Sequence, residues 1–272
     1  MRFTVHSHEV YCHTGGKDFD PALPVILLLH GAQNDHSVWA LQSRALAHRG
    51  YAVLAPDLPG HGLSGGPPLE SVEAMADWAL AVLDAAGAER ALVAGHSMGS
   101  LIALEAAHRA PQRVSALALL GTSYPMKVAD ALLETARTDP QTAIDMVAAW
   151  SHASMLPGPS TAGPGISVIN TARRLMQRMA ARGAAQLFHT DFAACNVYAN
   201  GEAAAASLAC PTLFVLGKKD MMTPPRSAAL LTGAVRHGRI AGVDAGHAML
   251  GEAPEAVLDA LLGLAHEAQS KG

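Results

Sequence analysis

Residues 91–104 read Ala-Leu-Val-Ala-Gly-His-Ser-Met-Gly-Ser-Leu-Ile-Ala-Leu, and two apolar segments meet there at the motif Gly95-His96-Ser97-Met98-Gly99. The first segment predicts a buried strand and the second an apolar helix. A strand that turns into a helix within so few residues strains the backbone of the central serine, and small flanking residues let the two elements approach each other. The stretch therefore predicts a serine hydroxyl exposed at the carboxyl edge of a sheet.

Further strand and helix signals lie on both sides of this motif. Continuous apolar runs, typical of strands covered on both faces, occupy residues 25–29, 51–55 and 114–120. Residues 72–86 carry apolar side chains at helical spacing and end at a glycine. Strand signals return at residues 212–216 and 239–243, and a final helix is expected over about 254–266. This alternation predicts an α/β fold with a mostly parallel, doubly wound sheet.

Residues 122–205 differ from the rest because they carry helix signals without strands. Asp139-Pro140 predicts a helix N-cap with proline at the first helical position. Two further helices are expected over about 166–182 and 184–195, separated from the first by the Pro-, Gly- and Ser-rich residues 151–165. We therefore expect a core made of residues 1–121 and 206–272, interrupted by a helical cap at 122–205. Long aperiodic loops are usually functional or disordered, so residues 151–165 are expected to act as a mobile gate.

A serine hydroxyl becomes a strong nucleophile only when a base takes its proton. Among 14 histidines, His247 has the expected context, a Gly-His step in the loop after the last predicted strand. The acid that orients such a base belongs after the preceding strand, where Gly217-Lys-Lys-Asp220 supplies Asp220. Asp244 is the local alternative, although it stands only three residues before His247, too near to face the ring easily.

Attack on a carbonyl creates an oxyanion that two N–H donors can stabilise. Met98 follows the serine at the start of a helix and supplies the first backbone N–H. The second is expected from the loop His30-Gly31-Ala32-Gln33, after the strand at 25–29. Ala32 is the preferred donor and Gln33 the alternative, while His30 is expected to brace the loop.

These motifs together resemble the α/β-hydrolase superfamily, in its serine-nucleophile, capped branch of bacterial esterases and carbon–carbon bond hydrolases. The resemblance covers nearly the whole core in the family's order. It rests on His30-Gly31 with Trp39, Asp57-Leu-Pro-Gly-His-Gly-Leu-Ser64, the motif around Ser97, Gly217-Lys-Lys-Asp220 with Thr223-Pro224, and Gly246-His247; Asp191-Phe-Ala-Ala-Cys-Asn196 is similar to a cap helix of bacterial members. It implies a core sheet of about eight strands and a helical cap, inserted after the sixth strand, that covers the site. Because position 97 is serine, the branches with an aspartate nucleophile fit poorly.

Two patterns suggest cofactor or metal sites but are better explained otherwise. Gly60-His-Gly62-Leu-Ser-Gly65 fits G-x-G-x-x-G, yet Pro67-Pro68 follows where a dinucleotide-binding loop would open a helix. His6 and His8 have a metal-like spacing that alternation along an N-terminal strand would explain. We therefore expect neither a cofactor nor a metal.

Composition sets the broad class. Half of the 272 residues are apolar and 15% are charged, which favours a sizeable core over disorder. The net charge of −4, with no long basic run, disfavours nucleic acid and anionic membranes as partners. Cys12, Cys195 and Cys210 are expected to be reduced thiols. With no signal-peptide pattern and no apolar run long enough to span a bilayer, a cytoplasmic location is expected, and a homodimer stays open.

The sequence thus predicts a serine hydrolase that cleaves a small to medium ester through an acyl-serine intermediate. The pocket is expected between core and cap, lined by Leu, Met and aromatic side chains of residues 122–205. Three other enzyme activities stay open: carbon–carbon bond hydrolysis of vinylogous diketones (the meta-cleavage-product type), thioester hydrolysis and lactone hydrolysis. A catalytically retired ligand-binding protein of the same fold is the alternative from another class.

Overall fold

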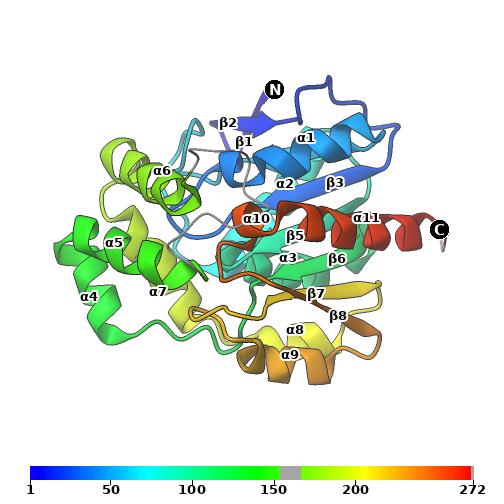
Figure 1. Cartoon of the computed structure of the whole chain (residues 1–272). Coiled ribbons are helices and arrows are strands. Elements are labelled where there is room, and N and C mark those ends of the chain that lie inside the picture. The colour runs from blue at the N-terminus through cyan, green and yellow to red at the C-terminus, as the bar shows by residue number, and fades with distance from the viewer. Residues whose placement is uncertain (154–166, 271–272) are drawn as a thin grey trace.

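One eight-stranded sheet organises the molecule (Figure 1). The computed structural model describes residues 1–153 and 167–270. In sheet order the strands are β1 (Arg2–Val5), β2 (His8–His13), β4 (Ala52–Pro56), β3 (Val25–Leu29), β5 (Ala91–His96), β6 (Val114–Leu120), β7 (Thr212–Gly217) and β8 (Gly238–Val243). All pairings from β4 to β8 are parallel, and β1 and β2 add an antiparallel edge. The predicted fold class is confirmed.

The two faces of the sheet carry separate apolar cores. Alternate residues of β3 point to opposite faces, so Leu27 and Leu29 join one core while Ile26 and Leu28 join the other. The first core packs against α2 (Val72–Ala85), α3 (Met98–Arg109), α8 (Gly201–Ala206) and α9 (Ala229–Ala234). The second packs against α1 (Ala40–His48) and α11 (Pro254–Ser270). Coverage of both faces explains why the central strands read as unbroken apolar runs.

In the described part of the chain five helices lie between β6 and β7; the last of them, α8, packs on the core, and the other four stand in the position predicted for the cap. They are α4 (Asp130–Thr138), α5 (Pro140–Ser151), α6 (Val168–Arg182) and α7 (Leu187–Val197), and they gather at one end of the sheet (Figure 1). Asp139 caps α5 as expected, because its side chain accepts a hydrogen bond from the Thr142 N–H. The cap thus follows the sixth strand, while the domain bounds at 121 and 205 stay a prediction. The predicted gate lies almost wholly outside the described residues.

Some local predictions were incomplete or wrong. His6 and Ser7 form the turn of the β1–β2 hairpin, with φ values of 48° and 68°, so alternation along a strand does not explain the His6/His8 spacing. Short helices such as α8, α9 and α10 (Met249–Glu252) gave no clear periodic signal because they contain at most two turns. Within the described ranges, no helix combines the length and apolar character needed to cross a membrane.

Candidate active site

The chain passes from β5 to α3 through a tight turn centred on Ser97. Ser97 has φ 55° and ψ −121°, a conformation that non-glycine residues rarely adopt. The flanking glycines have no space for a side chain. A Cβ on Gly95 would lie 1.9 Å from the Gly99 carbonyl oxygen, and one on Gly99 would lie 2.4 Å from the Leu29 carbonyl oxygen. The turn therefore needs both glycines.

The structure brings the three predicted side chains into one hydrogen-bonded chain. His247 Nε2 lies 2.9 Å from Ser97 Oγ, and His247 Nδ1 lies 2.8 Å from Asp220 Oδ2. A carboxylate can only accept, so the Nδ1–H donates to Asp220, and Nε2 is free to accept from the Ser97 hydroxyl. His247 and Asp220 are both buried. This tautomer is the one that a base for Ser97 requires.

Asp220 is held as a carboxylate by several donors. Its Oδ1 accepts the backbone N–H groups of Met222 and Thr223, and its Oδ2 accepts the Thr223 hydroxyl at 2.8 Å. Burial alone raises the pKa of Asp220, but the His247 ring and the Thr223 donors outweigh it and hold this pKa below its usual value. Asp220 is therefore ionised at neutral pH and fixes the orientation of the imidazole.

Sequence reasoning assigned no role to two polar residues beside this chain. The Thr223 hydroxyl lies 3.0 Å from both His247 Nδ1 and the Gly121 carbonyl oxygen, so it contacts His247 as well as Asp220. His96 donates its Nε2–H to the His247 carbonyl oxygen at 2.8 Å. Burial, together with the neighbouring His247, lowers the pKa of His96 to about 3, so this ring stays neutral and serves as a tether. The only sequence signal was position: Thr223 stands three residues after Asp220, and His96 directly precedes Ser97.

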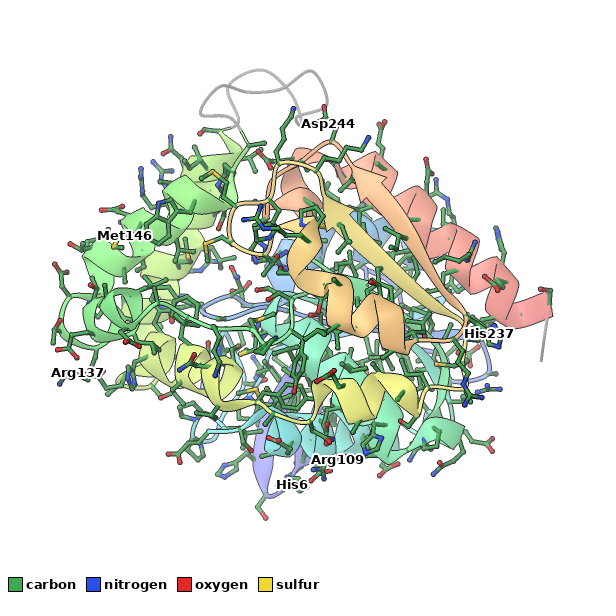
Figure 2. The ribbon with its side chains drawn as sticks, turned by 90° about the horizontal axis from the view of Figure 1, so that it is seen from below. His6, Arg109, Arg137, Met146, His237 and Asp244 are labelled. Carbon is green, nitrogen blue, oxygen red and sulfur yellow. The ribbon has the colours of Figure 1, made fainter. Side chains whose placement is uncertain are left out.

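The alternative acid is not near the site. Asp244 is exposed and forms an ion pair with Lys219, with 2.9 Å between Oδ1 and Nζ. Figure 2 shows Asp244 at the surface, beyond the end of the sheet. The short segment from Asp244 to His247 turns this carboxylate outward, away from the His247 ring.

The loop after β3 lies against Ser97 and brings the Ala32 N–H close to it. A Cβ on Gly31 would lie 3.1 Å from Ser97 Cβ. His30 braces this loop, since its Nδ1–H donates to the Gly31 carbonyl oxygen and its Nε2 accepts the Leu58 N–H. A trans peptide points its N–H opposite to its C=O, so the Ala32 N–H points away from His30. The N–H groups of Ala32 and Met98 have no partner in the described part of the chain.

Gln33, the alternative donor, is already occupied. Its N–H donates to Asp191 Oδ2 at 2.8 Å, and its side-chain amide donates to the Met176 carbonyl oxygen. Both contacts reach into cap helices more than 140 residues away in the sequence. Of these two candidates, Ala32 is the one whose N–H has no partner among the described residues.

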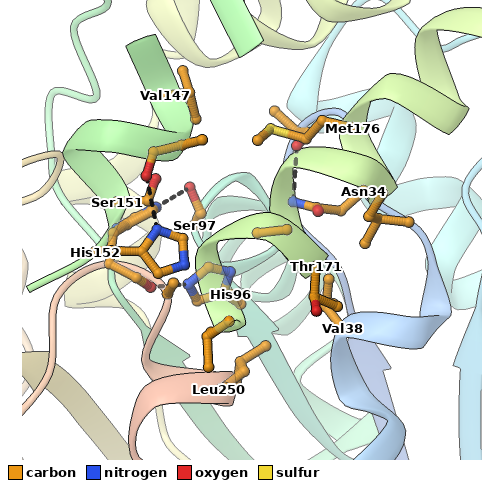
Figure 3. Close-up of a pocket in the computed structure, with 18 of the residues that line it drawn as sticks. Asn34, Val38, His96, Ser97, Val147, Ser151, His152, Thr171, Met176 and Leu250 are labelled. Carbon is orange, nitrogen blue, oxygen red and sulfur yellow. Dashed lines mark hydrogen bonds between the residues drawn. The ribbon is translucent and has the colours of Figure 1, made fainter. Parts of the chain in front are cut away.

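A pocket of about 650 Å³ opens above Ser97 between the core and the cap (Figure 3). The core contributes His96, Ser97, His247 and the loop after β3, while α5, α6 and α7 supply the opposite wall. Apolar side chains make up most of that wall: Val147, Ala148, Val168, Ala172, Leu175, Met176, Phe188 and Phe192. The expected Leu, Met and aromatic lining is thereby identified residue by residue.

Polar and charged groups also line the pocket. His152 follows α5 and points its ring toward Ser97 and His96 (Figure 3). Its Nδ1–H donates to the Ala148 carbonyl oxygen at 2.8 Å, and burial lowers its pKa, so it is a neutral ring. Two arginines of α6, Arg174 and Arg178, also line the pocket, and Arg178 pairs with Asp35.

One cluster has the composition of a metal site. Ligand atoms of Asp35, His36 and Asp57 lie within 4.8 Å of one another. Internal hydrogen bonds account for them: Asp57 accepts from the His36 ring and from the Leu63 N–H, and Asp35 accepts from Ser37 and pairs with Arg178. A Cβ on Gly62 would collide with the Asp57 carboxylate at 2.2 Å, so the glycine-rich segment is folded onto Asp57. The Asp35–His36–Asp57 cluster and the packing of the glycine-rich segment on Asp57 therefore hold these loops together.

Known proteins with this architecture agree with the fold. The model of the α/β hydrolase fold family matches residues 24–161. The chain is 29% identical over 229 residues to a putative carbamate hydrolase, RutD, of Klebsiella pneumoniae, covering 79% of this chain and 80% of the relative. It is 39% identical over 118 residues to an uncharacterised protein of Mycobacterium tuberculosis, covering 43% of this chain and spanning only 33% of that relative's length.

Two solved structures extend this likeness over nearly the whole chain. The enol-lactonase of Burkholderia xenovorans superposes with a TM-score of 0.82 at 23% identity, covering 96% of this chain and 98% of the other. The esterase of Exiguobacterium antarcticum gives a TM-score of 0.82 at 19% identity, covering 97% and 98%. At these identities the likeness establishes the fold, and with the family match, which spans half of the chain, it shows that the chain belongs to the α/β hydrolase fold family of hydrolytic enzymes.

Proposed function

We propose that the protein is a serine hydrolase that cleaves small to medium carboxylic esters through an acyl-serine intermediate. The observation that carries the proposal is the unbroken hydrogen-bonded chain from Ser97 through His247 to Asp220 at the base of an apolar pocket. A pure binding protein would gain nothing from this tautomer, this strained serine and two free N–H donors together. The catalytically retired alternative is therefore disfavoured.

The reaction follows from the geometry. His247 Nε2 takes the Ser97 proton as Oγ attacks the ester carbonyl carbon, and the oxyanion is stabilised by the Met98 and Ala32 N–H groups. The imidazolium, held by Asp220, then protonates the departing alcohol as the tetrahedral intermediate collapses to the acyl-enzyme. Water attacks this ester with His247 again as base, which releases the acid and restores Ser97.

The pocket favours an apolar substrate. Burial of each methylene against such a wall contributes roughly 0.8 kcal/mol, about a fourfold gain in kcat/KM per added carbon until the pocket is full. We therefore expect kcat/KM to rise with acyl length and then to fall once the chain outgrows the 650 Å³ available. A small molecule is the expected partner, and no metal or cofactor is required by these steps.

Carbamate hydrolysis is a second candidate, favoured by the likeness to RutD over most of both chains. It uses the same nucleophile, base and oxyanion donors and differs in the leaving group and in the stability of the carbamoyl-serine. Lactone, thioester and carbon–carbon substrates place other demands on the pocket and stay open within the family.

One substrate panel separates these activities. Chromogenic esters of graded acyl length, an aryl carbamate, a thioester, a lactone and a vinylogous diketone are assayed with the wild-type enzyme and with Ser97→Ala as the blank. The proposal predicts the highest kcat/KM among esters of short to medium acyl length. Faster turnover of the carbamate or the diketone would move the assignment to that class, and no turnover of any substrate would favour the binding protein.

A further inference from the structure

A buried carboxylate joins the cap to the two loops beside the nucleophile. Asp191 lies on α7 and is 0% exposed. Its Oδ2 accepts the Gln33 N–H at 2.8 Å and lies 2.9 Å from His61 Nε2. Gln33 belongs to the loop after β3, and His61 belongs to the glycine-rich loop after β4. One oxygen atom of the cap therefore fixes both loops.

Both ring nitrogens of the buried His61 face hydrogen-bond acceptors. His61 Nδ1 faces the Pro59 carbonyl oxygen at 3.0 Å, and Nε2 faces the Asp191 carboxylate. Both partners can only accept, so the ring carries a proton on each nitrogen. Burial alone lowers the pKa of His61, but the Asp191 carboxylate outweighs it and holds this pKa above its usual value. The pair is thus an imidazolium and a carboxylate, both inaccessible to solvent.

The peptide group between Ala32 and Gln33 is held at both ends. Asp191 accepts its N–H, and the Asn34 side chain donates to its carbonyl oxygen at 3.0 Å. Gln33 has a φ of 55°, in the left-handed region that a glutamine occupies only when its surroundings compensate. The Asp191 contact and the Gln33–Met176 hydrogen bond provide that compensation. Without them this peptide could rotate and carry Ala32 with it.

We propose that Asp191 and His61 are a positioning pair for the oxyanion hole, a role that rests on the serine hydrolase function proposed above. Asp191 holds the Gln33 N–H away from the reaction centre and fixes the loop so that the Ala32 N–H faces the oxyanion. His61, which lies against the same oxygen, holds the carboxylate in this position. The cap thereby contributes to transition-state stabilisation through the core loop, in addition to covering the pocket.

Stability alone is a poor reason for this arrangement. The second carboxylate oxygen of Asp191, Oδ1, is buried and has no hydrogen-bond partner in the described part of the chain. A buried ion pair with an unsatisfied oxygen is often no more stable than an apolar replacement of similar volume. A role in positioning accounts for a carboxylate in this place.

The main test removes the carboxylate with Asp191→Ala. Loss of one oxyanion donor costs about 100-fold to 1,000-fold in kcat, and misplacement of that donor should cost about 10-fold to 100-fold, with KM changed less than about threefold. A trifluoromethyl ketone forms a hemiketal with Ser97 that carries an oxyanion. Its affinity for the variant should fall in parallel with kcat/KM. A merely structural role would not link these two quantities.

His61 offers a matched pair of variants. His61→Gln keeps a donor near the position of Nε2 and should retain most of kcat, whereas His61→Asn keeps only the contact to Pro59 and should resemble Asp191→Ala. Tyr198→Phe is the control: it removes a hydrogen bond of 2.8 Å to Glu105, equally buried and at the end of the same helix, but remote from the loop after β3. Both kcat and ketone affinity should stay within about threefold of wild type in this variant.

The outcomes separate the two proposals. If Asp191→Ala does not fold, the His61 variants and Asn34→Ala, which releases the other end of the peptide, carry the test. Folded variants with wild-type kcat and ketone affinity, beside an inactive Ser97→Ala, would overturn the positioning role and leave serine hydrolysis intact. A wild-type protein that neither hydrolyses esters nor binds the ketone would overturn both proposals.

Discussion

At the scale of single residues, the site depends on which oxygen faces which nitrogen. Asp220 stands 27 residues before His247 and Asp244 only three residues before it. Only the more distant carboxylate, that of Asp220, contacts the His247 ring. The strand β7 carries Asp220 to the correct sheet edge, and the Met222 and Thr223 N–H groups then orient it. Asp244, one residue past β8, turns to solvent and pairs with Lys219.

This difference gives a paired prediction for the acid. Asp220→Asn should lower kcat on the order of a thousandfold or more, because an amide favours the wrong imidazole tautomer. Asp244→Asn should change kcat less than about threefold, because this exposed carboxylate pairs with Lys219 and does not contact the His247 ring. Steady-state kinetics on one chromogenic ester checks both variants. The reverse ranking would move the acid to Asp244.

At the scale of elements, the turn between β5 and α3 depends on two backbones in close contact. Gly95→Ala forces a Cβ to within 1.9 Å of the Gly99 carbonyl oxygen, and this backbone atom cannot move without disturbing the helix. We expect a loss of about 3 kcal/mol or more in the free energy of unfolding. Urea unfolding followed by circular dichroism measures it.

Gly87→Ala is the matched control for this turn. Gly87 ends α2 with a φ of 70°, and a Cβ there would have nothing within 4 Å. Its substitution should cost only the strain of a left-handed alanine, about 1–2 kcal/mol. Gly95 has no such positive φ, so a loss at Gly95 no larger than that at Gly87 would contradict the claim that the approach of β5 and α3 requires glycine.

The elements also show what sequence patterns can and cannot predict. The long elements were predicted because a largely apolar run, as in β3 and β6, or a helical period over several turns, as in α2, leaves a clear signal. The order of Ser97, Asp220 and His247 followed from strand-end positions. The link from Asp191 to Gln33 could not be predicted, because it joins residues 158 apart whose neighbours carry no local signal. The same holds for Thr223, whose contact with His247 depends on how two loops meet.

At the scale of the whole molecule, buried carboxylates couple stability to pH. Asp57 is 0% exposed; burial raises its pKa, but hydrogen bonds and charge from His36 outweigh this and hold it below the ordinary 3.8. A carboxyl group whose pKa is lower in the folded state stabilises the protein at pH values above its unfolded-state pKa. This stabilisation is lost as the pH falls through the folded-state pKa. The same sign applies to Asp220 and Glu105.

The free energy of unfolding should therefore fall as pH drops below about 4. Asp57→Asn should be less stable than wild type at pH 7 and should lose less further stability on acidification, because one fewer proton is taken up on unfolding. Urea unfolding between pH 3 and pH 7 checks this. Parallel curves for the two proteins would mean that Asp57 titrates alike in the folded and unfolded states.

A second prediction at this scale concerns metals. The proposed steps need only Ser97, His247, Asp220 and two N–H groups, and the Asp35–His36–Asp57 cluster is held by internal hydrogen bonds. Ester hydrolysis should thus be unchanged after exhaustive dialysis against a chelator. Loss of activity that a divalent metal restores would contradict the mechanism.

The central claim is that Ser97 is the nucleophile, and covalent labelling tests it most directly. Trypsin should release residues 91–109, which contain both Ser97 and Ser100, so fragmentation of the peptide after treatment with a fluorophosphonate distinguishes the two hydroxyls. Wild-type protein should carry one adduct, on Ser97. The Ser97→Ala variant should carry none and should keep no more than about a hundredth of the wild-type activity. An adduct on another residue, or a Ser97→Ala variant with more activity than that, would contradict the claim.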